Sequence, residues 1–155
     1  MWFSKKKTAK TEARPCSLKN EEGKCALIAP GGNGNPLTPF IYDAISPLQT
    51  DGLSYYHCTN DGKQGLLELN GDVIIPCEMD VMEVDRNIIM FKQGDKWGLY
   101  ATHGVLVMPM YDEINELDSF VHVRLGDEWG FLDLEEGKFM TEEEDSFEKG
   151  MLMFF

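Results

Sequence analysis

Histidine and cysteine are the side chains of this chain best suited to nucleophilic catalysis or metal binding, and both are few. The 155 residues include three histidines, at positions 57, 103 and 122, and four cysteines, at positions 16, 25, 58 and 77. No two cysteines have the Cys-x-x-Cys spacing of a zinc or redox motif. His57 and Cys58 are adjacent in an expected strand, so their side chains point to opposite faces and do not readily share a metal. We therefore expect no metal site, and a Cys–His nucleophilic pair would need a long-range proximity that the sequence does not show.

Other patterns that could do chemistry are also weak. There is no Gly-x-x-x-x-Gly-Lys-Ser/Thr motif, and the glycine-rich residues 31–34 precede a proline rather than the helix of a phosphate site. Asp51-Gly52 and Asp61-Gly62 are turn pairs without the spacing of a calcium loop. Paired carboxylates are abundant, but in so acidic a chain they do not identify a catalytic pair. We assign no catalytic residue and no cofactor.

The charge is strongly and unevenly negative. The net charge is −13, yet residues 1–24 hold seven Lys/Arg against three Glu, a net of +4. The remainder holds seven Lys/Arg against 24 Asp/Glu, a net of −17. Such a body repels phosphates, so we expect no nucleic-acid partner. It favours a basic partner, although acidity alone also keeps a protein soluble.

Residues 1–18 are polar and basic and are expected to form a flexible arm. No apolar stretch of ~7–15 residues there resembles a secretory signal, and no segment has the ~18 apolar residues that span a bilayer. We therefore expect a cytoplasmic protein with reduced cysteines. Attachment of Lys5-Lys6-Lys7 and its aromatic neighbours to anionic lipid is the less favoured alternative.

The elements that would position any site come from an internal repeat. The dyads Gln64-Gly65, Trp97-Gly98 and Trp129-Gly130 lie 33 and 32 residues apart, and each lies between two glycine-containing turns. A fixed period in this range indicates one small unit whose core forms when copies pack together. Short apolar runs joined by glycine turns are hairpin signals. We therefore predict an all-β domain over residues 19–155, made of tandem antiparallel units of about 32 residues.

Three full units are expected, over residues 37–72, 73–104 and 105–137, with half-units over 19–36 and 138–155. Each full unit begins with an apolar strand that ends at a proline, which suits a sheet edge. A bent piece follows, and then two strands joined by a glycine turn. The half-units could close a barrel- or propeller-like ring by pairing residues 151–155 with 24–29; the alternative is an open stack with two capping copies. Residues 141–144 have the spacing of a capping box, which is compatible with a single helical turn, but the acidic run 142–145 is interpreted as a solvated loop.

The residues that recur in the units have structural explanations. A tryptophan at a strand start can cover the end of a neighbouring core, and the glycine after it allows another backbone to approach. An aspartate after the proline strand can accept backbone N–H groups and hold the bend. The recurring set is Pro39, Tyr42, Asp43, Gln64, Gly65, Pro76, Asp80, Trp97, Gly98, Pro109, Tyr111, Asp112, Trp129 and Gly130.

The order of these residues resembles that of the bacterial WG (Trp-Gly) β-repeat family. The shared pattern is a proline, Tyr-Asp-x-Ile, a variable strand, Gly-Asp-x-Trp-Gly-Phe/Leu and a closing glycine. The resemblance covers roughly residues 23–140 and is strongest in the last two copies, whereas Gln64, Met79 and the Cys25-Ala26 dyad depart from it. It implies tandem antiparallel β units. It implies no common catalytic residues, so none is carried over to this chain.

Three functional hypotheses follow. The first is a non-catalytic protein-binding module, such as an acidic immunity or regulatory factor that covers a basic partner. The second is an accessory or assembly protein that acts through its basic N-terminal arm, at a membrane or an acidic partner. The third is an enzyme of unknown type. Charge and architecture favour the first.

Overall fold

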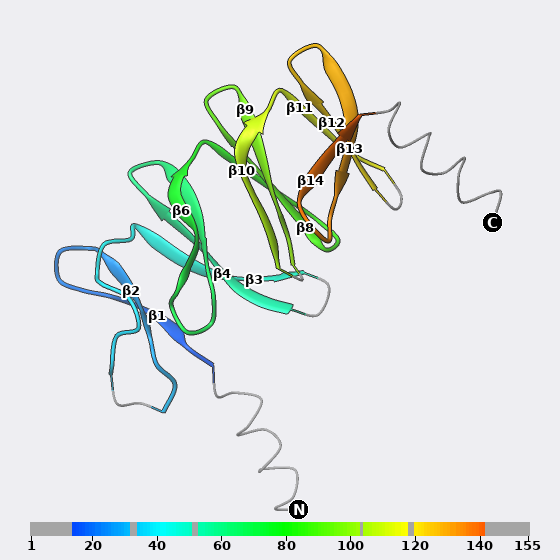
Figure 1. Ribbon diagram of the computed structural model, residues 1–155. Helices are drawn as coiled ribbons and strands as arrows, with labels where there is room; N and C mark the ends of the chain where they lie inside the picture. Colours follow the sequence, from blue (N-terminus) through cyan, green and yellow to red (C-terminus); the bar gives the residue numbers. More distant parts are fainter. Residues whose placement is uncertain (1–13, 32–33, 51–52, 103, 118–119, 142–155) are drawn as a thin grey trace, which may run out of the picture. The chain divides into compact units, whose positions relative to one another are not determined.

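The computed structural model describes residues 14–31, 34–50, 53–102, 104–117 and 120–141, which form strands β1 to β14 and contain no helix (Figure 1). Every strand pairing is antiparallel. The prediction of an all-β, antiparallel protein is therefore confirmed. No helix in the described part of the chain is long and apolar enough to cross a membrane. Most of the expected arm, the helical turn beyond residue 141 and the strand at 151–155 lie outside the described residues.

The chain divides into two compact units, Met1–Met79 (unit 1) and Asp80–Phe155 (unit 2). Unit 1 contains a two-stranded sheet and a four-stranded sheet in the order β3-β4-β5-β6 (Figure 1). Its strands are β1 (Cys16–Lys19), β2 (Cys25–Ile28), β3 (Ala44–Thr50), β4 (Leu53–Asn60), β5 (Lys63–Leu67) and β6 (Val73–Met79).

Unit 2 contains two four-stranded sheets, in the orders β7-β8-β9-β10 and β11-β12-β13-β14. Consecutive strands are neighbours in both, so each sheet is a simple antiparallel meander. The strands are β7 (Val81–Asp85), β8 (Ile88–Gln93), β9 (Lys96–Ala101), β10 (Val105–Tyr111), β11 (Glu113–Leu117), β12 (Phe120–Leu125), β13 (Glu128–Asp133) and β14 (Lys138–Thr141).

Both edges of β2 are occupied within unit 1. One edge pairs with β1. On the other edge, the amide of Cys25 donates to the carbonyl of Tyr42, and the amide of Leu27 donates to Thr38 Oγ1 at 3.0 Å. This corrects the expected pairing of residues 24–29 with 151–155, because β2 has no edge left for another strand. No closed barrel is present among the described strands.

The strand β1 corrects the predicted extent of the arm, which was expected to run to residue 18. Residues 16–19 instead form a hairpin with β2. The Asn20 side chain holds the connecting turn by accepting the amides of Glu22 and Lys24 at 3.0 and 2.9 Å. All four residues of β1 are exposed, so the strand has no alternating apolar pattern by which it could be predicted.

The predicted unit boundaries are also shifted relative to the sheets. Residues 73–79 and 105–111 were expected to open units, but they form β6 and β10, the last strands of the sheets that precede those boundaries. The reason is local: a glycine turn joins each of these strands to the strand before it, and that hairpin forms in preference to a longer connection. The four-stranded sheets therefore span residues 44–79, 81–111 and 113–141.

The prolines of β6 and β10 do not end their strands. β6 continues from Pro76 to Met79, and β10 continues from Pro109 to Tyr111. The strand register shifts in both regions, between Gln64 and Leu66 opposite β6 and between Val107 and Tyr111 in β10. A bulge of this kind frees residues from the ladder, so the missing N–H of proline is tolerated. Both strands are sheet edges.

Each unit has a core formed where its two sheets pack. The core of unit 1 consists of Cys25, Leu27, Tyr42, Ile45, Tyr56, Cys58 and Leu67, with Leu37 and Cys77 packed against it. The core of unit 2 consists of Ile88, Leu99, Val107, Tyr111, Val121, Val123 and Leu132, with Met90, Val105, Ile114, Leu134 and Phe139 packed against it. The two sets occupy similar positions along the strands, but only the first contains cysteine.

Candidate functional site

Each recurring aspartate lies just before the first strand of a four-stranded sheet and closes the same hydrogen bond. Its carboxylate accepts a backbone amide from the tight turn between the second and third strands of that sheet. The N···O distances are 2.6 Å from Asp61 to Asp43, 2.8 Å from Gly94 to Asp80 and 2.8 Å from Gly126 to Asp112. Gly94 and Gly126 have positive φ, and Asp61 takes the same left-handed conformation with φ of 54°. The aspartates thus fix the turns on which the sheets depend.

Two of these carboxylates also pair with a lysine that begins or precedes a strand. Lys24 Nζ binds Asp43 Oδ1, and Lys96 Nζ binds Asp112 Oδ1. The lysine, followed by the turn amide, holds the pKa of each aspartate below its usual value, and the aspartate raises the pKa of each lysine. Three of the four side chains are 38–45% exposed and that of Asp112 is 20% exposed, so the pairs position the chain more than they stabilise it.

The dyad glycines lie where a side chain would collide with a neighbouring strand. A Cβ at Gly65 would lie 2.6 Å from the carbonyl oxygen of Ile75, and one at Gly98 would lie 2.6 Å from that of Val107. At Gly130 the nearest atom would be the carbonyl oxygen of Met140, at 2.2 Å. Each contact is with the last strand of the sheet, so glycine at this position permits the close approach of two backbones.

The two dyad tryptophans, Trp97 and Trp129, are half-buried and have chemically different neighbours. Lys92 Nζ lies 5.5 Å from the ring centroid of Trp97, which is cation–π geometry. The ring of Trp129 stacks on that of His122, with centroids 4.5 Å apart, and His122 also contacts Phe131 at 5.2 Å. The second arrangement gathers three rings on one face of β12 and β13.

The first dyad replaces this aromatic contact with a polar one. Gln64 stands at the tryptophan position, and its Oε1 lies 2.9 Å from Nε2 of His57. His57 lies one residue before the partner of the dyad glycine, as His122 does in β12. Of the histidines, His103 lies outside the described residues.

The remaining recurring residues divide between core and surface. Tyr42 and Tyr111 are buried in the cores of units 1 and 2, and Met79, which stands at the tyrosine position, is also buried. Pro39 is exposed, in an irregular segment that follows the buried Thr38. Burial, with the Cys58 and Cys77 thiols as smaller causes, raises the pKa of Tyr42 to about 12.

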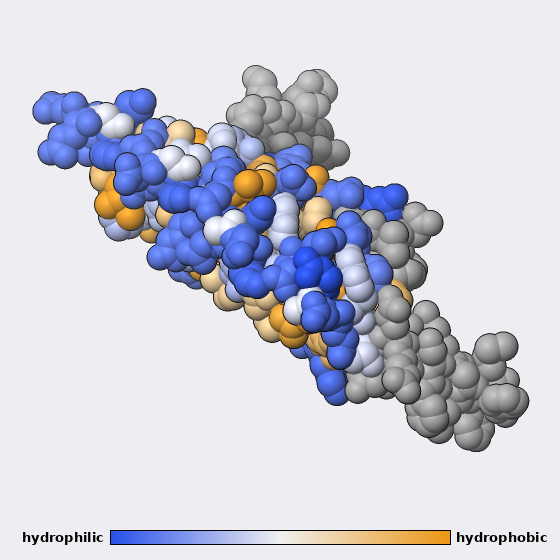
Figure 2. Space-filling model, turned by 90° about the horizontal axis from the view of Figure 1, so that it is seen from above, coloured by the Kyte–Doolittle hydropathy of each residue, from blue (hydrophilic) through white to orange (hydrophobic). Residues whose placement is uncertain are grey.

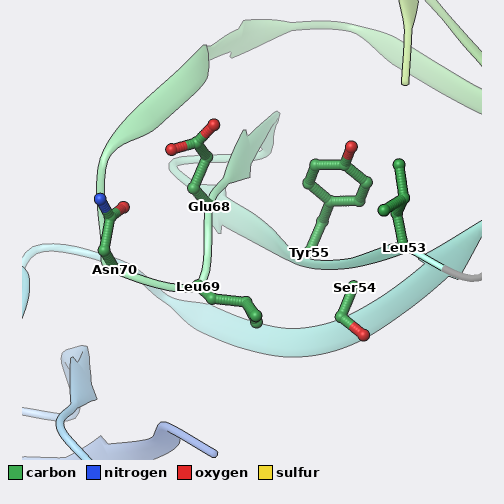
Figure 3. Close-up of a pocket in the computed structure, with 6 residues that line it drawn as sticks. All are labelled: Leu53, Ser54, Tyr55, Glu68, Leu69 and Asn70. Atoms are coloured by element: carbon green, nitrogen blue, oxygen red, sulfur yellow. The ribbon is translucent and has the colours of Figure 1, made fainter. Parts of the chain in front are cut away.

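An open hollow of about 390 Å³ lies on unit 1 beside the start of β4 and the turn after β5 (Figure 3). Its apolar part includes the exposed side chains of Leu53 and Leu69. Tyr55 and Glu68 project on one side of the chain, and Ser54 points to the other side (Figure 3). No sequence pattern predicts this hollow, because the pairing of β4 with β5 brings its two sides together.

The thiols of Cys58 and Cys77 lie 3.2 Å apart. Cys58 is in β4 and Cys77 in β6, the two strands that flank β5. Gly65 of β5 lies between them: it pairs with Cys58, and a Cβ on it would be 2.9 Å from the amide nitrogen of Cys77. The hydrogen bond from Cys58 lowers the pKa of Cys77, and the same bond with burial raises the pKa of Cys58. The sequence analysis missed the pair, because the two cysteines lack the Cys-x-x-Cys spacing of a recognisable motif.

The net charge differs sharply between the units. Unit 1 contains eight Lys/Arg and nine Asp/Glu, a net of −1, whereas unit 2 contains six and 18, a net of −12. One face of the surface is mostly hydrophilic, with small separate hydrophobic patches (Figure 2). Within the described ranges, no group of three or more His, Cys, Asp or Glu side chains is placed to hold a metal ion.

Comparison of the chain with protein-family models, curated proteins and solved structures gives no match. The geometry of the chain is therefore the basis on which a function can be assigned.

Proposed function

We propose that this chain is a non-catalytic protein-binding module, built from WG-type β units, that recognises a basic partner through unit 2. The observation that carries the proposal is the concentration of charge, since unit 2 holds −12 of the net −13. A strongly negative surface raises the rate of encounter with a basic partner and discriminates against acidic ones.

The shared geometry of the sheets supports the repeat part of the proposal. The aspartate-to-turn hydrogen bond recurs in all three four-stranded sheets, and the same backbone approach recurs at all three dyad glycines. We place the unit from the aspartate to the end of the bulged strand, so that one four-stranded sheet is one unit. Such sheets offer broad surfaces on which loops vary while the framework does not.

The three rings of His122, Trp129 and Phe131 are the contact site that we assign within unit 2. Trp129 and Phe131 are both partly exposed on β13, and His122 lies against both rings. Aromatic side chains are enriched among residues that dominate binding energy, and their faces attract Lys and Arg. The exposed Asp127 and Glu128 directly precede Trp129 in the same hairpin. A basic loop is therefore the ligand that this surface favours.

Capture from a lysate of the organism that encodes the chain tests the proposal. The bait is the full chain, compared with Asp127→Lys/Glu128→Lys in unit 2 and with Glu21→Lys/Glu22→Lys in unit 1. All four carboxylates are exposed, so both double variants should fold. We expect a basic partner that is held at low salt, released at high salt and lost only with the unit 2 variant. Equal loss with both variants, or no retained partner, would contradict the proposal.

A second candidate function is favoured by the exposed strand β1. No described strand hydrogen-bonds to its outer edge, whereas the corresponding strands β4, β8 and β12 each have a neighbour there. Arg14 precedes β1 and Lys19 is its last residue, so an acidic extended segment would suit this edge. This is the mode in which an accessory protein could act through its basic N-terminal region.

The double variant Arg14→Glu/Lys19→Glu separates the two candidates, because it reverses the charge beside the edge of β1 and leaves unit 2 unaltered. Capture that survives this variant supports recognition by unit 2. Capture that is lost with this variant, but kept by Asp127→Lys/Glu128→Lys, supports the edge of β1 instead.

A further inference from the structure

We propose that Cys58 and Cys77 are a peroxide-reactive dithiol that forms a reversible intramolecular disulfide. The geometric basis is the 3.2 Å separation of their sulfur atoms, which is a hydrogen-bond contact that needs about 1.2 Å of closure to reach the ~2.05 Å of a disulfide. The inference is independent of the proposed binding function, since it concerns the core of unit 1.

The two thiols differ in the way that a reactive and a resolving cysteine must differ. Cys77 is partly exposed on an edge strand, so a small oxidant can reach it. Cys58 is 1% exposed, and its thiol is in hydrogen-bond contact with that of Cys77. A thiolate at Cys77 would accept this bond from Cys58, and the thiolate is the form that reacts with peroxides.

The reaction balances with a hydroperoxide as the oxidant. The Cys77 thiolate attacks the outer oxygen of the hydroperoxide and the O–O bond breaks. The departing alkoxide (or hydroxide, from hydrogen peroxide) takes up the proton that the Cys77 thiol released, and leaves as an alcohol (or water). This gives a sulfenic acid at Cys77. The Cys58 sulfur then attacks the Cys77 sulfur, the S–O bond breaks, and hydroxide leaves with the Cys58 proton as water. In total two thiols and one hydroperoxide give one disulfide, one alcohol and one water.

The backbone around the pair explains why such a disulfide would be reversible. Cys58 and Cys77 lie on the two strands that flank β5, and Gly65 is the β5 residue between them. A disulfide across an intervening strand must join backbones that are farther apart than those of neighbouring strands, so it carries strain. Strained disulfides are more easily reduced. The β5–β6 register shifts between Gln64 and Leu66, so Cys77 has no Cα partner in the regular ladder.

The remaining cysteines provide internal controls. Cys16 is exposed on β1 and outside the cluster. Cys25 lies in the same core, but its thiol contacts the carbonyl of Asp43 at 3.7 Å. If exposure alone determined which cysteine is oxidised, Cys16 would react first. If a place in the core were sufficient, Cys25 would react in the same way as Cys58.

The test treats the folded full chain with one equivalent of hydrogen peroxide and measures the products by intact-mass and peptide mass spectrometry. We expect a loss of two hydrogens, a linked peptide pair containing Cys58 and Cys77, and full recovery of both thiols with dithiothreitol. Cys16→Ser should form the same link at an unchanged rate. Oxidation confined to Cys16, or a link between any other two cysteines, would overturn the proposal.

The variant Cys58→Ser tests the resolving role by chemistry rather than by stability. Without Cys58, the sulfenic acid at Cys77 should persist and be captured by dimedone, with at least a tenfold higher yield of adduct than in the unaltered chain. Circular dichroism establishes that the variant is folded. If Cys58→Ser is not folded, Cys77→Ser is used instead. In that variant the loss of two hydrogens should not occur, and Cys58 should stay reduced. A dimedone yield that is the same with and without Cys58 would refute the assignment.

Discussion

Units 1 and 2 place the same backbone features around differently composed cores. Each has a buried tyrosine before the recurring aspartate, and each has a fully buried leucine two residues after the first dyad position, Leu27 and Leu99. At the position that pairs with the dyad glycine, unit 1 has Cys58 and unit 2 has Phe91 and Val123. A strand framework of this kind specifies where side chains meet, and composition then decides whether the meeting point is inert or reactive.

The two units also differ in net charge and in the candidate sites that they contain. Unit 1 is nearly neutral and contains the hollow and the thiol pair, whereas unit 2 is strongly acidic and contains the three-ring site. The proposed thiol chemistry and the proposed recognition site therefore lie in different units of one chain.

The largest effect is expected from deleting the equivalent core leucines. Leu27→Ala and Leu99→Ala should each lower the free energy of unfolding by about 2–5 kcal/mol, because both side chains are fully buried. Hydrogen exchange resolved by segment should show the loss in unit 1 for the first and in unit 2 for the second. Leu106→Ala is the control, since this side chain is exposed and should cost under about 0.5 kcal/mol. A leucine variant no less stable than the control would show that the two cores are not built alike.

The next effect concerns the dyad glycines. Gly65→Ala and Gly98→Ala should each cost about 1–3 kcal/mol, because the added methyl group would meet backbone atoms at 2.6 Å. Gly94→Asn is the matched control: it has open space and a left-handed conformation that asparagine tolerates. Chemical denaturation measures all three. If Gly98→Ala cost no more than Gly94→Asn, the close approach of the strands would not be the reason for glycine there.

A smaller effect is expected from acid. The pKa values of Asp43 and Asp112 are lowered in the folded chain, so their contribution is complete above the unfolded value of about 3.9 and is lost as the pH falls below it. The pKa values of Lys24 and Lys96 are raised in the folded chain. Their contribution to the free energy of unfolding is therefore complete below the unfolded value of about 10.4 and is lost as the pH rises above it.

The double variant Asp43→Asn/Asp112→Asn checks the acid effect. Its free energy of unfolding should fall less steeply than that of the unaltered chain between pH 5 and pH 3, when both are measured by urea titration. Glu21→Gln/Glu22→Gln is the control, because these exposed carboxylates lie outside the aspartate bends. An unchanged slope in the aspartate variant would refute the role of the bends.

The smallest effect should be confined to the alkaline range. The Tyr42 phenol should titrate near pH 12, well above the usual value of about 10, because it is buried. Absorbance at 295 nm measures this, and Tyr42→Phe should remove that late transition. The folded chain holds the phenolic proton more tightly than the unfolded chain does. The protonated Tyr42 phenol therefore contributes to the free energy of unfolding, and this contribution is lost as the pH rises from about 10 to 12. A Tyr42 transition near pH 10 would contradict the packing of unit 1.

Sequence reasoning succeeded where the signal was local. Short apolar runs between glycine turns predicted antiparallel strands, and the described residues form them. It failed at β1, whose four residues are all exposed and carry no alternating apolar pattern. It also separated Cys58 from Cys77, since they are 19 residues apart with another strand between them.

By itself the sequence determined the strand class, the period of the dyads and the uneven charge, because each depends on residue type and near-neighbour spacing. Only the tertiary structure decided which strand closes each sheet, that β2 has both edges filled, and that two thiols meet beside Gly65. These depend on which distant segments share a sheet, and that choice is made by packing over the whole unit rather than by any local preference.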